Sequence, residues 1–224
     1  VSGFLNMLVA VKDSSVKRMV YAASSSTYGD SKELPKVEER IGKPLSPYAV
    51  TKYVNELYAD VFGKTYGIDT IGLRYFNVFG PRQNPKGAYA AVIPLFAQSI
   101  INDQAPFING DGEQTRDFTF VENAVQANVK ALLTENPDTK NGVVNVAVGD
   151  RISLNELFSI LNRVANKSLT PIYRAPRQGD VRDSLASIEK ARELFEYEPR
   201  IGYEAGLVKT YHWLRENQDF INRS

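Results

Sequence analysis

Tyr48, Lys52 and Ser24 have the types and the spacing that suit removal of a proton from an alcohol. Tyr48 and Lys52 stand four residues apart, so they share one face if their segment is helical. A phenol ordinarily loses its proton near pH ~10, but a neighbouring ammonium group favours the phenolate, and a serine hydroxyl can hydrogen-bond the same substrate oxygen. Tyrosine and lysine with this spacing also occur on helices without a catalytic role. The triplet therefore predicts proton transfer if the surrounding elements bring the three residues together.

Two elements must position this triplet. The apolar run 20–23 reads as a buried strand that ends at Ser24, and the segment 47–66 reads as a helix with Pro47 at its first position and Ser46 as its cap. Apolar residues in 1–11 also have helical spacing. Strands and helices alternate along the chain, which predicts a mostly parallel sheet covered by helices. We expect strands near 18–23, 70–75, 118–121 and 143–147, and helices near 47–66, 91–102, 122–133, 154–165, 188–194 and 204–217.

Composition excludes several classes of function. The chain has 224 residues, is 43% apolar and 24% charged, and has a formal net charge of +1, with basic residues spread among acidic ones. We therefore expect no nucleic-acid partner. Because there is no cysteine and only one histidine, His212, we expect neither disulfides nor a metal site. No apolar stretch has the length of a membrane span and no signal peptide is visible, so we expect a cytoplasmic protein without a membrane partner.

Three segments resemble those of a known family. They are SSSTYGD at 24–30, SPYAVTK at 46–52 and RYFNVFGPR at 74–82. Together they resemble the extended short-chain dehydrogenase/reductase family, within it the nucleotide-sugar 4-epimerases, and most nearly the UDP-N-acetylglucosamine 4-epimerase branch. The resemblance implies an α/β fold, in which the C-terminal part of a doubly wound parallel Rossmann sheet is interleaved with a smaller α/β substrate domain.

The resemblance also implies a division into domains. An NAD-binding domain would comprise 1–80 and 114–150, and a nucleotide-sugar-binding domain would comprise 81–113 and 151–224. Members of this family carry a glycine-rich turn for the cofactor's pyrophosphate near the N-terminus, and no such turn occurs in this sequence. We therefore expect a chain that lacks the first strands of the sheet and most NAD contacts, and that alone holds the cofactor poorly. NAD, as opposed to NADP, is implied by the resemblance only.

The resemblance assigns cofactor contacts to the catalytic residues Ser24, Tyr48 and Lys52. Tyr75 and Phe76, at the C-terminal end of an expected strand, join them as candidate cofactor-binding residues, since doubly wound folds bind ligands there. Both aromatic side chains are equally compatible with a role in the core.

A second set of residues is implied to bind the nucleotide sugar. It consists of Ser25, Ser26, Asn77, Ala91, Val92, Phe107, Ile108, Asn109, Arg116, Arg177, Asp180 and Ser184. The guanidinium groups of Arg116 and Arg177 suit a diphosphate, and the Asp180 carboxylate suits ribose hydroxyls. Each arginine taken alone is also compatible with a surface ion pair. By the resemblance, Phe107, Ile108 and Asn109 would surround the uracil.

The residues after Ser24 favour one reaction of the family. Dehydratases of the family carry an acid pair where this chain has Ser25 and Ser26, which argues against loss of water. The expected activity is that of an isomerase, an NAD-dependent 4-epimerase of UDP-hexoses. Tyr48 would take the proton of the 4-hydroxyl while hydride passes to NAD, and the transient 4-keto sugar would be reduced on its opposite face.

Ser184 bears on the choice of sugar, because galactose-type epimerases of the family carry a tyrosine at this position. A small residue leaves room for an acetamido group, which favours UDP-N-acetylglucosamine and UDP-N-acetylgalactosamine, although Ser184 is also compatible with no substrate role. The alternatives are a UDP-glucuronate decarboxylase or 4-epimerase, or a non-catalytic Rossmann-type binding protein.

A homodimer through the helices at 1–12 and 47–66 is implied as well, because members of the family pair these helices across a dimer axis. An apolar stripe on the second helix fits this expectation, although the stripe alone is compatible with a face that covers the sheet. Its members are Val50, Val54, Leu57, Tyr58 and Val61.

Overall fold

The computed structural model describes residues 1–85, 91–176 and 181–219. The chain divides into two compact units. Unit 1 comprises Val1–Phe76, Glu122–Gly149 and Leu185–Arg200. Unit 2 comprises Asn77–Val121, Asp150–Ser184 and Ile201–Ser224. The units divide at other residues than the expected domains, most visibly at 185–200, which belongs with unit 1. The assignment of cofactor and nucleotide sugar to separate domains stays a prediction.

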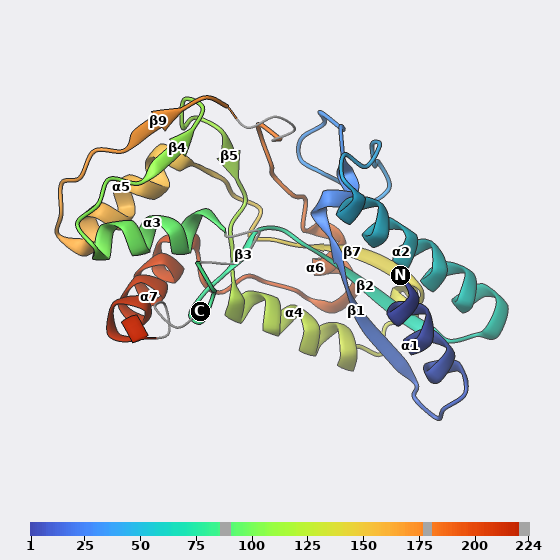
Figure 1. The fold of residues 1–224 in the computed structure, drawn as a ribbon. Coiled ribbons are helices and arrows are strands. Elements are labelled where there is room, and N and C mark those ends of the chain that lie inside the picture. The colour runs from blue at the N-terminus through green and yellow to red at the C-terminus, as the bar shows by residue number, and fades with distance from the viewer. Residues whose placement is uncertain (86–90, 177–180, 220–224) are drawn as a thin grey trace. The chain divides into compact units, whose positions relative to one another are not determined.

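Unit 1 is built on a three-stranded parallel sheet in the order β1-β2-β7 (Figure 1). The strands are β1 (Arg18–Ser24), β2 (Asp69–Tyr75) and β7 (Gly142–Val146). Parallel neighbours need a crossover, and the helix α2 (Pro47–Tyr66) supplies it between β1 and β2. The central strand β2 is buried at five consecutive positions, as in a sheet covered on both faces. This confirms the expected Rossmann-like parallel α/β fold.

The two faces of this sheet are covered by different helices. Apolar residues of β2 and β7 pack with those of α4 (Val121–Leu133) and α6 (Glu189–Phe195). On the other face, Tyr21 and Ala23 of β1 pack with Ala59 of α2 and with Phe4 of α1 (Ser2–Lys12). The short 3-10 helix η1 (Ser25–Tyr28) follows β1 directly, and η2 (Pro137–Thr139) precedes β7. Ser24 therefore lies at the carboxyl end of a strand, where a turn begins.

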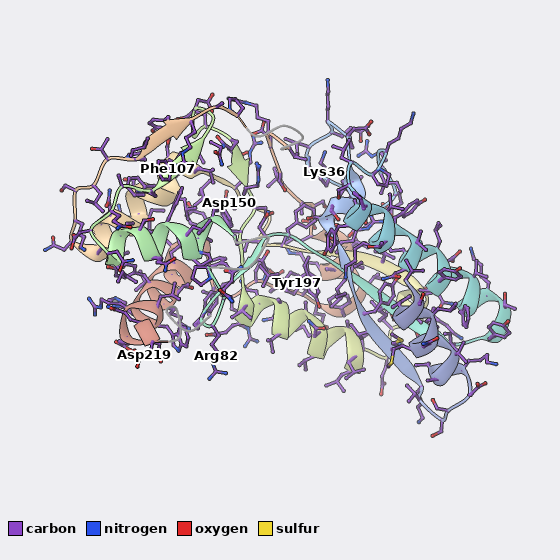
Figure 2. All side chains as sticks on the ribbon, in the orientation of Figure 1. Lys36, Arg82, Phe107, Asp150, Tyr197 and Asp219 are labelled. Carbon is purple, nitrogen blue, oxygen red and sulfur yellow. The ribbon has the colours of Figure 1, made fainter. Side chains whose placement is uncertain are left out.

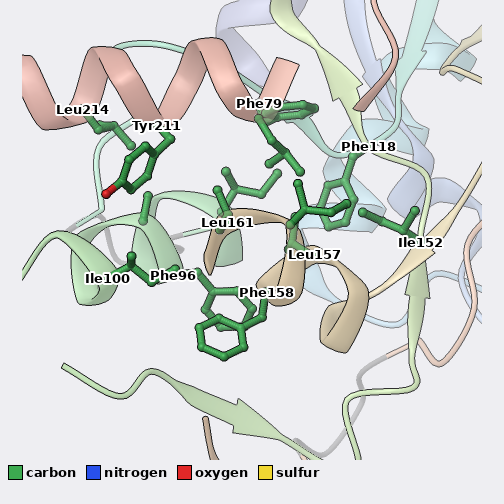
Figure 3. Close-up of a cluster of buried hydrophobic side chains, with 14 of the residues drawn as sticks. Phe79, Phe96, Ile100, Phe118, Ile152, Leu157, Phe158, Leu161, Tyr211 and Leu214 are labelled. Carbon is green, nitrogen blue, oxygen red and sulfur yellow. The ribbon is translucent and has the colours of Figure 1, made fainter. Parts of the chain in front are cut away.

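Unit 2 has a core of its own, formed by three helices and by short strands (Figure 3). The helices are α3 (Val92–Ile101), α5 (Leu154–Ala165) and α7 (Tyr203–Glu216). Ser153 caps α5, because its hydroxyl accepts the Glu156 N–H at 3.1 Å. The rings of Phe96 and Phe158 meet edge to face between α3 and α5, with centroids 5.7 Å apart. These contacts hold the helices together without any long strand.

The described part of unit 2 also holds three pairs of short strands. β3 (Val78–Phe79) pairs with β6 (Thr119–Phe120) in parallel, and β5 (Thr115–Arg116) pairs with β8 (Ile152–Ser153) in antiparallel orientation. β4 (Phe107–Asn109) pairs in parallel with β9 (Ile172–Arg174), with Asn109 opposite Arg174. The strand expected near 118–121 is thus only two residues long, and α4 already begins at Val121.

Candidate functional site

Unit 1 holds the three candidate catalytic residues on β1 and α2. Ser24 is the last residue of β1, and Tyr48 and Lys52 lie in the first two turns of α2. The Lys52 ammonium donates a hydrogen bond to the Ala22 carbonyl at 2.9 Å, two residues before Ser24. The same nitrogen lies 5.7 Å from the centroid of the Tyr48 ring. A positive charge is therefore placed beside the phenol and tied to the strand that ends at Ser24.

The start of α2 is set by local hydrogen bonding. Ser46 has an extended backbone, and its hydroxyl accepts the Ala49 N–H at 3.1 Å. Pro47 occupies the first helical turn, where its missing N–H costs nothing. The Tyr48 side chain is 54% exposed, so its phenol is accessible to a ligand.

The hydroxyl of Ser24 is oriented by the turn that follows it. It accepts the Ser26 N–H at 3.2 Å and the Ser26 hydroxyl at 2.9 Å. Ser24 itself is buried, whereas Ser25 and Ser26 are partly exposed. Ser26 therefore holds the Ser24 hydroxyl, and direct contact of Ser25 or Ser26 with a sugar stays a prediction.

The two aromatic candidates for cofactor contact lie in different environments. Tyr75 ends β2 opposite Ser24, and its hydroxyl accepts a hydrogen bond from the Asn128 amide at 2.7 Å. Burial raises the pKa of Tyr75. Phe76 is only 1% exposed and packs in the core of unit 1, with its ring 5.9 Å from that of Tyr28. A cofactor contact through either side chain remains a prediction.

The groups at this end of the sheet fit a dinucleotide by their chemistry. A lysine ammonium has three N–H donors, and the Ala22 carbonyl accepts one from Lys52. Ribose hydroxyls can accept from such a donor and can exchange hydrogen bonds with the hydroxyls of Tyr48 and Ser24. Ser24 lies at the carboxyl end of a parallel strand and Lys52 of α2 bonds the same strand, so these groups gather at the usual ligand position of doubly wound sheets.

Unit 2 contains a pocket of about 590 Å³. Its lining includes seven of the residues that the sequence predicts for nucleotide-sugar binding. They are Asn77, Ala91, Val92, Phe107, Ile108, Asn109 and Arg116. Ser184 does not line this pocket, although its N–H donates to the Thr115 carbonyl next to Arg116 at 3.1 Å. Arg177 and Asp180 lie outside the described residues.

Phe107 is the large exposed aromatic residue of this pocket, with 49% of its surface accessible (Figure 2). The guanidinium carbon of Arg174 lies 3.0 Å from the centroid of its ring. The parallel pairing of β4 and β9 brings Phe107 and Arg174 together. Sequence reasoning missed Arg174, because two three-residue strands separated by more than sixty residues give no readable pairing signal.

Two polar residues of the pocket are held by the backbone around β5 and β6. Asn77 has a positive φ of 34°, and its amide donates to the Asp117 carbonyl at 2.9 Å. Arg116 donates to the carbonyls of Thr115 and Arg182 at 2.8 and 2.9 Å. Non-glycine residues with positive φ are frequent at ligand sites, where the surrounding structure enforces them.

A second hollow of about 450 Å³ shares Asn109, Gln114 and Arg174 with the first. The Gln114 amide donates to the Asn109 carbonyl at 2.6 Å, and Arg182 pairs with Asp111 at 3.0 Å. The Glu113 N–H and the Arg182 guanidinium lower the pKa of Asp111. Arg174 is thus common to both hollows, which marks it as a candidate ligand-binding residue.

Two structural features are absent from the described part of the chain. None of its helices combines the length and the apolar character that crossing a lipid bilayer requires. Within 1–85, 91–176 and 181–219, no three histidine, cysteine, aspartate or glutamate side chains gather as metal ligands.

The chain is similar to several proteins that are described as UDP-sugar 4-epimerases. The chain is 38% identical over 218 residues to a putative UDP-glucose 4-epimerase of Methanocaldococcus jannaschii, covering 97% of this chain and 69% of that protein. A UDP-N-acetylglucosamine 4-epimerase from Methanobrevibacter ruminantium, solved with UDP-N-acetylmuramic acid, superposes with a TM-score of 0.91 at 37% identity, covering 96% of this chain and 68% of that one. A UDP-glucuronic acid 4-epimerase from Bacillus cereus, solved with UDP-glucuronic acid and NAD, superposes with a TM-score of 0.87 at 30% identity, covering 95% and 66%.

The chain thus spans about two thirds of the length of these relatives. The sequence pattern of the family described as "NAD dependent epimerase/dehydratase family" matches residues 1–147, which include all three candidate catalytic residues. The cofactor of this family is NAD, in agreement with the expectation from sequence. The chain belongs to the NAD dependent epimerase/dehydratase family.

Proposed function

We propose that the protein of which this chain is part is an NAD-dependent 4-epimerase of UDP-hexoses. The observation that carries the proposal is the Lys52 ammonium, which lies beside the Tyr48 ring and is bonded to the strand that ends at Ser24. The pocket of unit 2, which gathers seven of the expected nucleotide-sugar residues, supports it. The relatives named above are UDP-sugar 4-epimerases, which favours this reaction over dehydration.

In this mechanism, the chain's own residues handle the proton of the sugar's 4-hydroxyl. Tyr48 accepts that proton, Ser24 hydrogen-bonds the same oxygen, and Lys52 supplies a positive charge near the tyrosine ring. When bound, NAD supplies the carbon that takes up and returns a hydride. Tyr48 then gives its proton back to the oxygen of the transient 4-keto sugar. The configuration at carbon 4 is inverted if the sugar presents its other face.

The residues of unit 2 serve the nucleotide under this proposal. Phe107 offers its ring to the uracil, with Ile108 and Asn109 beside it, and Arg116 and Asn77 offer N–H donors to the diphosphate. Arg177 and Asp180 are proposed from the sequence alone, for the diphosphate and the ribose. The unit with the parallel sheet would bind NAD and the other unit the nucleotide sugar.

For the sugar, we propose the pair UDP-N-acetylglucosamine and UDP-N-acetylgalactosamine. By the family resemblance, Ser184 supports this choice, since galactose-type epimerases carry the larger tyrosine at this position. Replacement of Ser184 by tyrosine is therefore expected to slow turnover of the acetylated sugars more than that of UDP-glucose. Equal effects on both would remove the argument from Ser184.

A UDP-glucuronate 4-epimerase is the second candidate, because one relative was solved with UDP-glucuronic acid. The test is to incubate the whole protein with UDP-N-acetylglucosamine, UDP-glucose or UDP-glucuronate in separate reactions and to follow the products by proton NMR. We expect the galacto epimer of the acetylated sugar to form fastest, without net NADH. Fastest epimerisation of the uronate would favour the second candidate, release of carbon dioxide would indicate a decarboxylase, and no conversion of any sugar would overturn the proposed function.

We further propose a homodimer through α1 and α2. The supporting observation is that Val50, Leu57 and Val61 of α2 are about half exposed, and Met7 of α1 is more than half exposed. These exposed side chains of the α2 stripe favour an interface over a face that covers the sheet.

A further inference from the structure

The helix α2 buries three small residues and one charged residue within unit 1. Its buried positions are Ala49, Glu56, Ala59 and Gly63. Three of these are alanine or glycine, which let a helix approach closely but offer no large side chain that interlocks with the sheet. Glu56 is the one long side chain among the four. Among these four positions, Glu56 is therefore the one that can fix the helix along and around its axis through a specific contact.

Glu56 binds Arg74 of β2 through two parallel hydrogen bonds. Arg74 Nε donates to Oε1 at 3.0 Å, and Nη2 donates to Oε2 at 2.8 Å. Both side chains are 5% exposed. A buried ion pair adds little net stability, because desolvation opposes the attraction, but its two-point geometry specifies position. The pair therefore fixes α2 relative to β2 more than it strengthens the fold.

Arg74 is itself immobilised from other directions. Its Nη1 donates to the Glu38 carbonyl at 2.9 Å, and its guanidinium carbon lies 5.0 Å from the centroid of the Tyr28 ring. Burial alone would lower the pKa of Arg74, but the hydrogen bonds and the charge of Glu56 raise it above its usual value. The Arg74 guanidinium therefore keeps its positive charge in the folded protein.

The same carboxylate reaches the turn that follows Ser24. The hydroxyl of Thr27, in η1, donates to Oε1 of Glu56 at 3.4 Å, and Thr27 is fully buried. Glu56 follows Lys52 by four residues and Tyr48 by eight, so all three share a face of α2. One buried group thus joins the helix of Tyr48 and Lys52 to the turn after Ser24.

We propose that Glu56, Arg74 and Thr27 are positioning residues that hold the Ser24 turn in register with the Tyr48 and Lys52 face of α2. The inference rests on the proposed function, in which these three residues act on one hydroxyl group. Loss of the Thr27 hydroxyl releases the turn from Glu56 and leaves the Glu56–Arg74 pair in place. The consequence is a misplaced Ser24 hydroxyl and a slower chemical step, with substrate affinity unchanged.

The test is a double-mutant cycle with Thr27→Val and Ser24→Ala in the whole protein, assayed with UDP-N-acetylglucosamine. Thr27→Val is expected to lower kcat about tenfold with KM unchanged, since small misplacements of reacting groups slow catalysis strongly. In the Ser24→Ala background, Thr27→Val should have less than about a twofold effect, because the group that it positions is gone. An equal loss in both backgrounds would overturn the inference.

Thr210→Val is the matched control. Thr210 is fully buried, and its hydroxyl donates to the Gly206 carbonyl at 2.8 Å within unit 2. This variant should lower the melting temperature about as much as Thr27→Val and leave kcat unchanged. If both variants lower kcat alike, Thr27 has only a structural role.

Hydrogen exchange supplies a readout that does not depend on turnover. The segment 25–28 should exchange faster in Thr27→Val than in the unmodified protein, and Thr210→Val should not change it. Unchanged exchange in Thr27→Val would contradict the inference even if the protein turned over another sugar. If Tyr48→Phe retains full activity, the proposed function is wrong. If activity depends on Tyr48 but the effects of Thr27→Val and Ser24→Ala are additive, only the positioning role of Thr27 is wrong.

Discussion

At the scale of single residues, two tyrosines of α2 form a matched pair. Tyr48 and Tyr66 are both 54% exposed, and each has a lysine ammonium near its ring, Lys52 at 5.7 Å and Lys12 at 5.4 Å from the centroid. Only Tyr48 lies in the first turn of α2, with its lysine bonded to β1. Exposure and a nearby cation are thus common to both residues, and position alone distinguishes them.

Tyr48→Phe is therefore expected to lower kcat by about 10²–10⁴, the usual contribution of a general base, and Tyr66→Phe by less than about twofold. Initial rates by proton NMR measure both variants, and circular dichroism checks that both are folded. If Tyr66→Phe lowers kcat as much as Tyr48→Phe, the loss of activity results from a disturbed helix α2 and not from removal of a general base.

Arg174 is the second residue whose role can be isolated. Its guanidinium covers a face of the Phe107 ring in the pocket of unit 2, so Arg174→Ala should weaken binding of UDP about 5- to 30-fold. Arg163→Ala is the control, because Arg163 is exposed in the same unit and pairs only with the exposed Glu204 among the contacts described for it. Isothermal titration with UDP measures both. Equal affinities of the two variants would remove Arg174 from the binding site.

At the scale of elements, close packing decides the effect of two helical glycines. A Cβ on Gly206 of α7 would lie 2.8 Å from ring atoms of both Phe79 and Phe120, whereas a Cβ on Gly3 of α1 would meet nothing within 4 Å. Helix propensity alone favours alanine at either position by about 1 kcal/mol. Overpacking against buried rings costs about 1–3 kcal/mol and outweighs that gain at Gly206.

Gly206→Ala should therefore lower the melting temperature, and Gly3→Ala should leave it unchanged or raise it. Differential scanning calorimetry measures both shifts. A rise for Gly206→Ala would mean that α7 and the strands beneath it adjust without cost.

The long elements could be predicted because each has a local signal. The helix α2 has a serine cap, a proline in its first turn and Gly67 at its end with a φ of 72°, and its bounds agree with the prediction. The strands β3, β4, β5, β8 and β9 have only two or three residues, too few to show a period. Their pairing is decided by packing between distant segments, so the pocket around Phe107 could be foreseen only by resemblance.

The same reason explains which functional residues were missed. The four-residue spacing of Tyr48 and Lys52 indicates a catalytic pair, and the position of Ser24 directly after an apolar run indicates the end of a strand. In the sequence, Glu56 resembles any charged residue on a helix. Its role follows only from its contacts with Arg74 and Thr27, which the fold creates. Arg174 reads likewise as an ordinary basic residue.

At the scale of the whole molecule, buried phenols make stability depend on pH. Burial raises the pKa of Tyr28 to about 12, although Arg74 opposes the shift. The folded protein thus keeps this proton between pH 10 and 12, where the unfolded chain loses it, so the free energy of unfolding falls as the pH rises through this window. Burial also raises the pKa of Tyr21, which acts in the same direction.

Tyr28→Phe should be less stable near neutral pH, because it loses the 2.7 Å hydrogen bond to Asn145. Between about pH 8 and pH 11.5, the free energy of unfolding of this variant should fall by about 2 kcal/mol less than that of the unmodified protein. Urea unfolding across this range measures the difference in slope. Parallel curves for the two proteins would show that Tyr28 does not titrate with a raised pKa.

The proposed homodimer is a second property of the whole molecule that can be tested. If α1 and α2 form the dimer interface, Val61→Asp should yield a monomer, because a charge would be buried in an apolar contact. Val125→Asp on α4 is the control, since Val125 is exposed to nearly the same degree as Val61. Light scattering after gel filtration measures both masses. A dimer that survives Val61→Asp, or one that Val125→Asp disrupts, would contradict the proposed interface.

Incubation in D₂O with UDP-N-acetylglucosamine tests the central claim most directly. If Tyr48 removes only a hydroxyl proton and the hydrogen on carbon 4 leaves and returns as hydride, the 4-epimer should form with no solvent deuterium on any ring carbon, as read by proton NMR and mass spectrometry. Tyr48→Phe should form almost none of it. Deuterium on a ring carbon of the product, or an unchanged rate in Tyr48→Phe, would contradict the account.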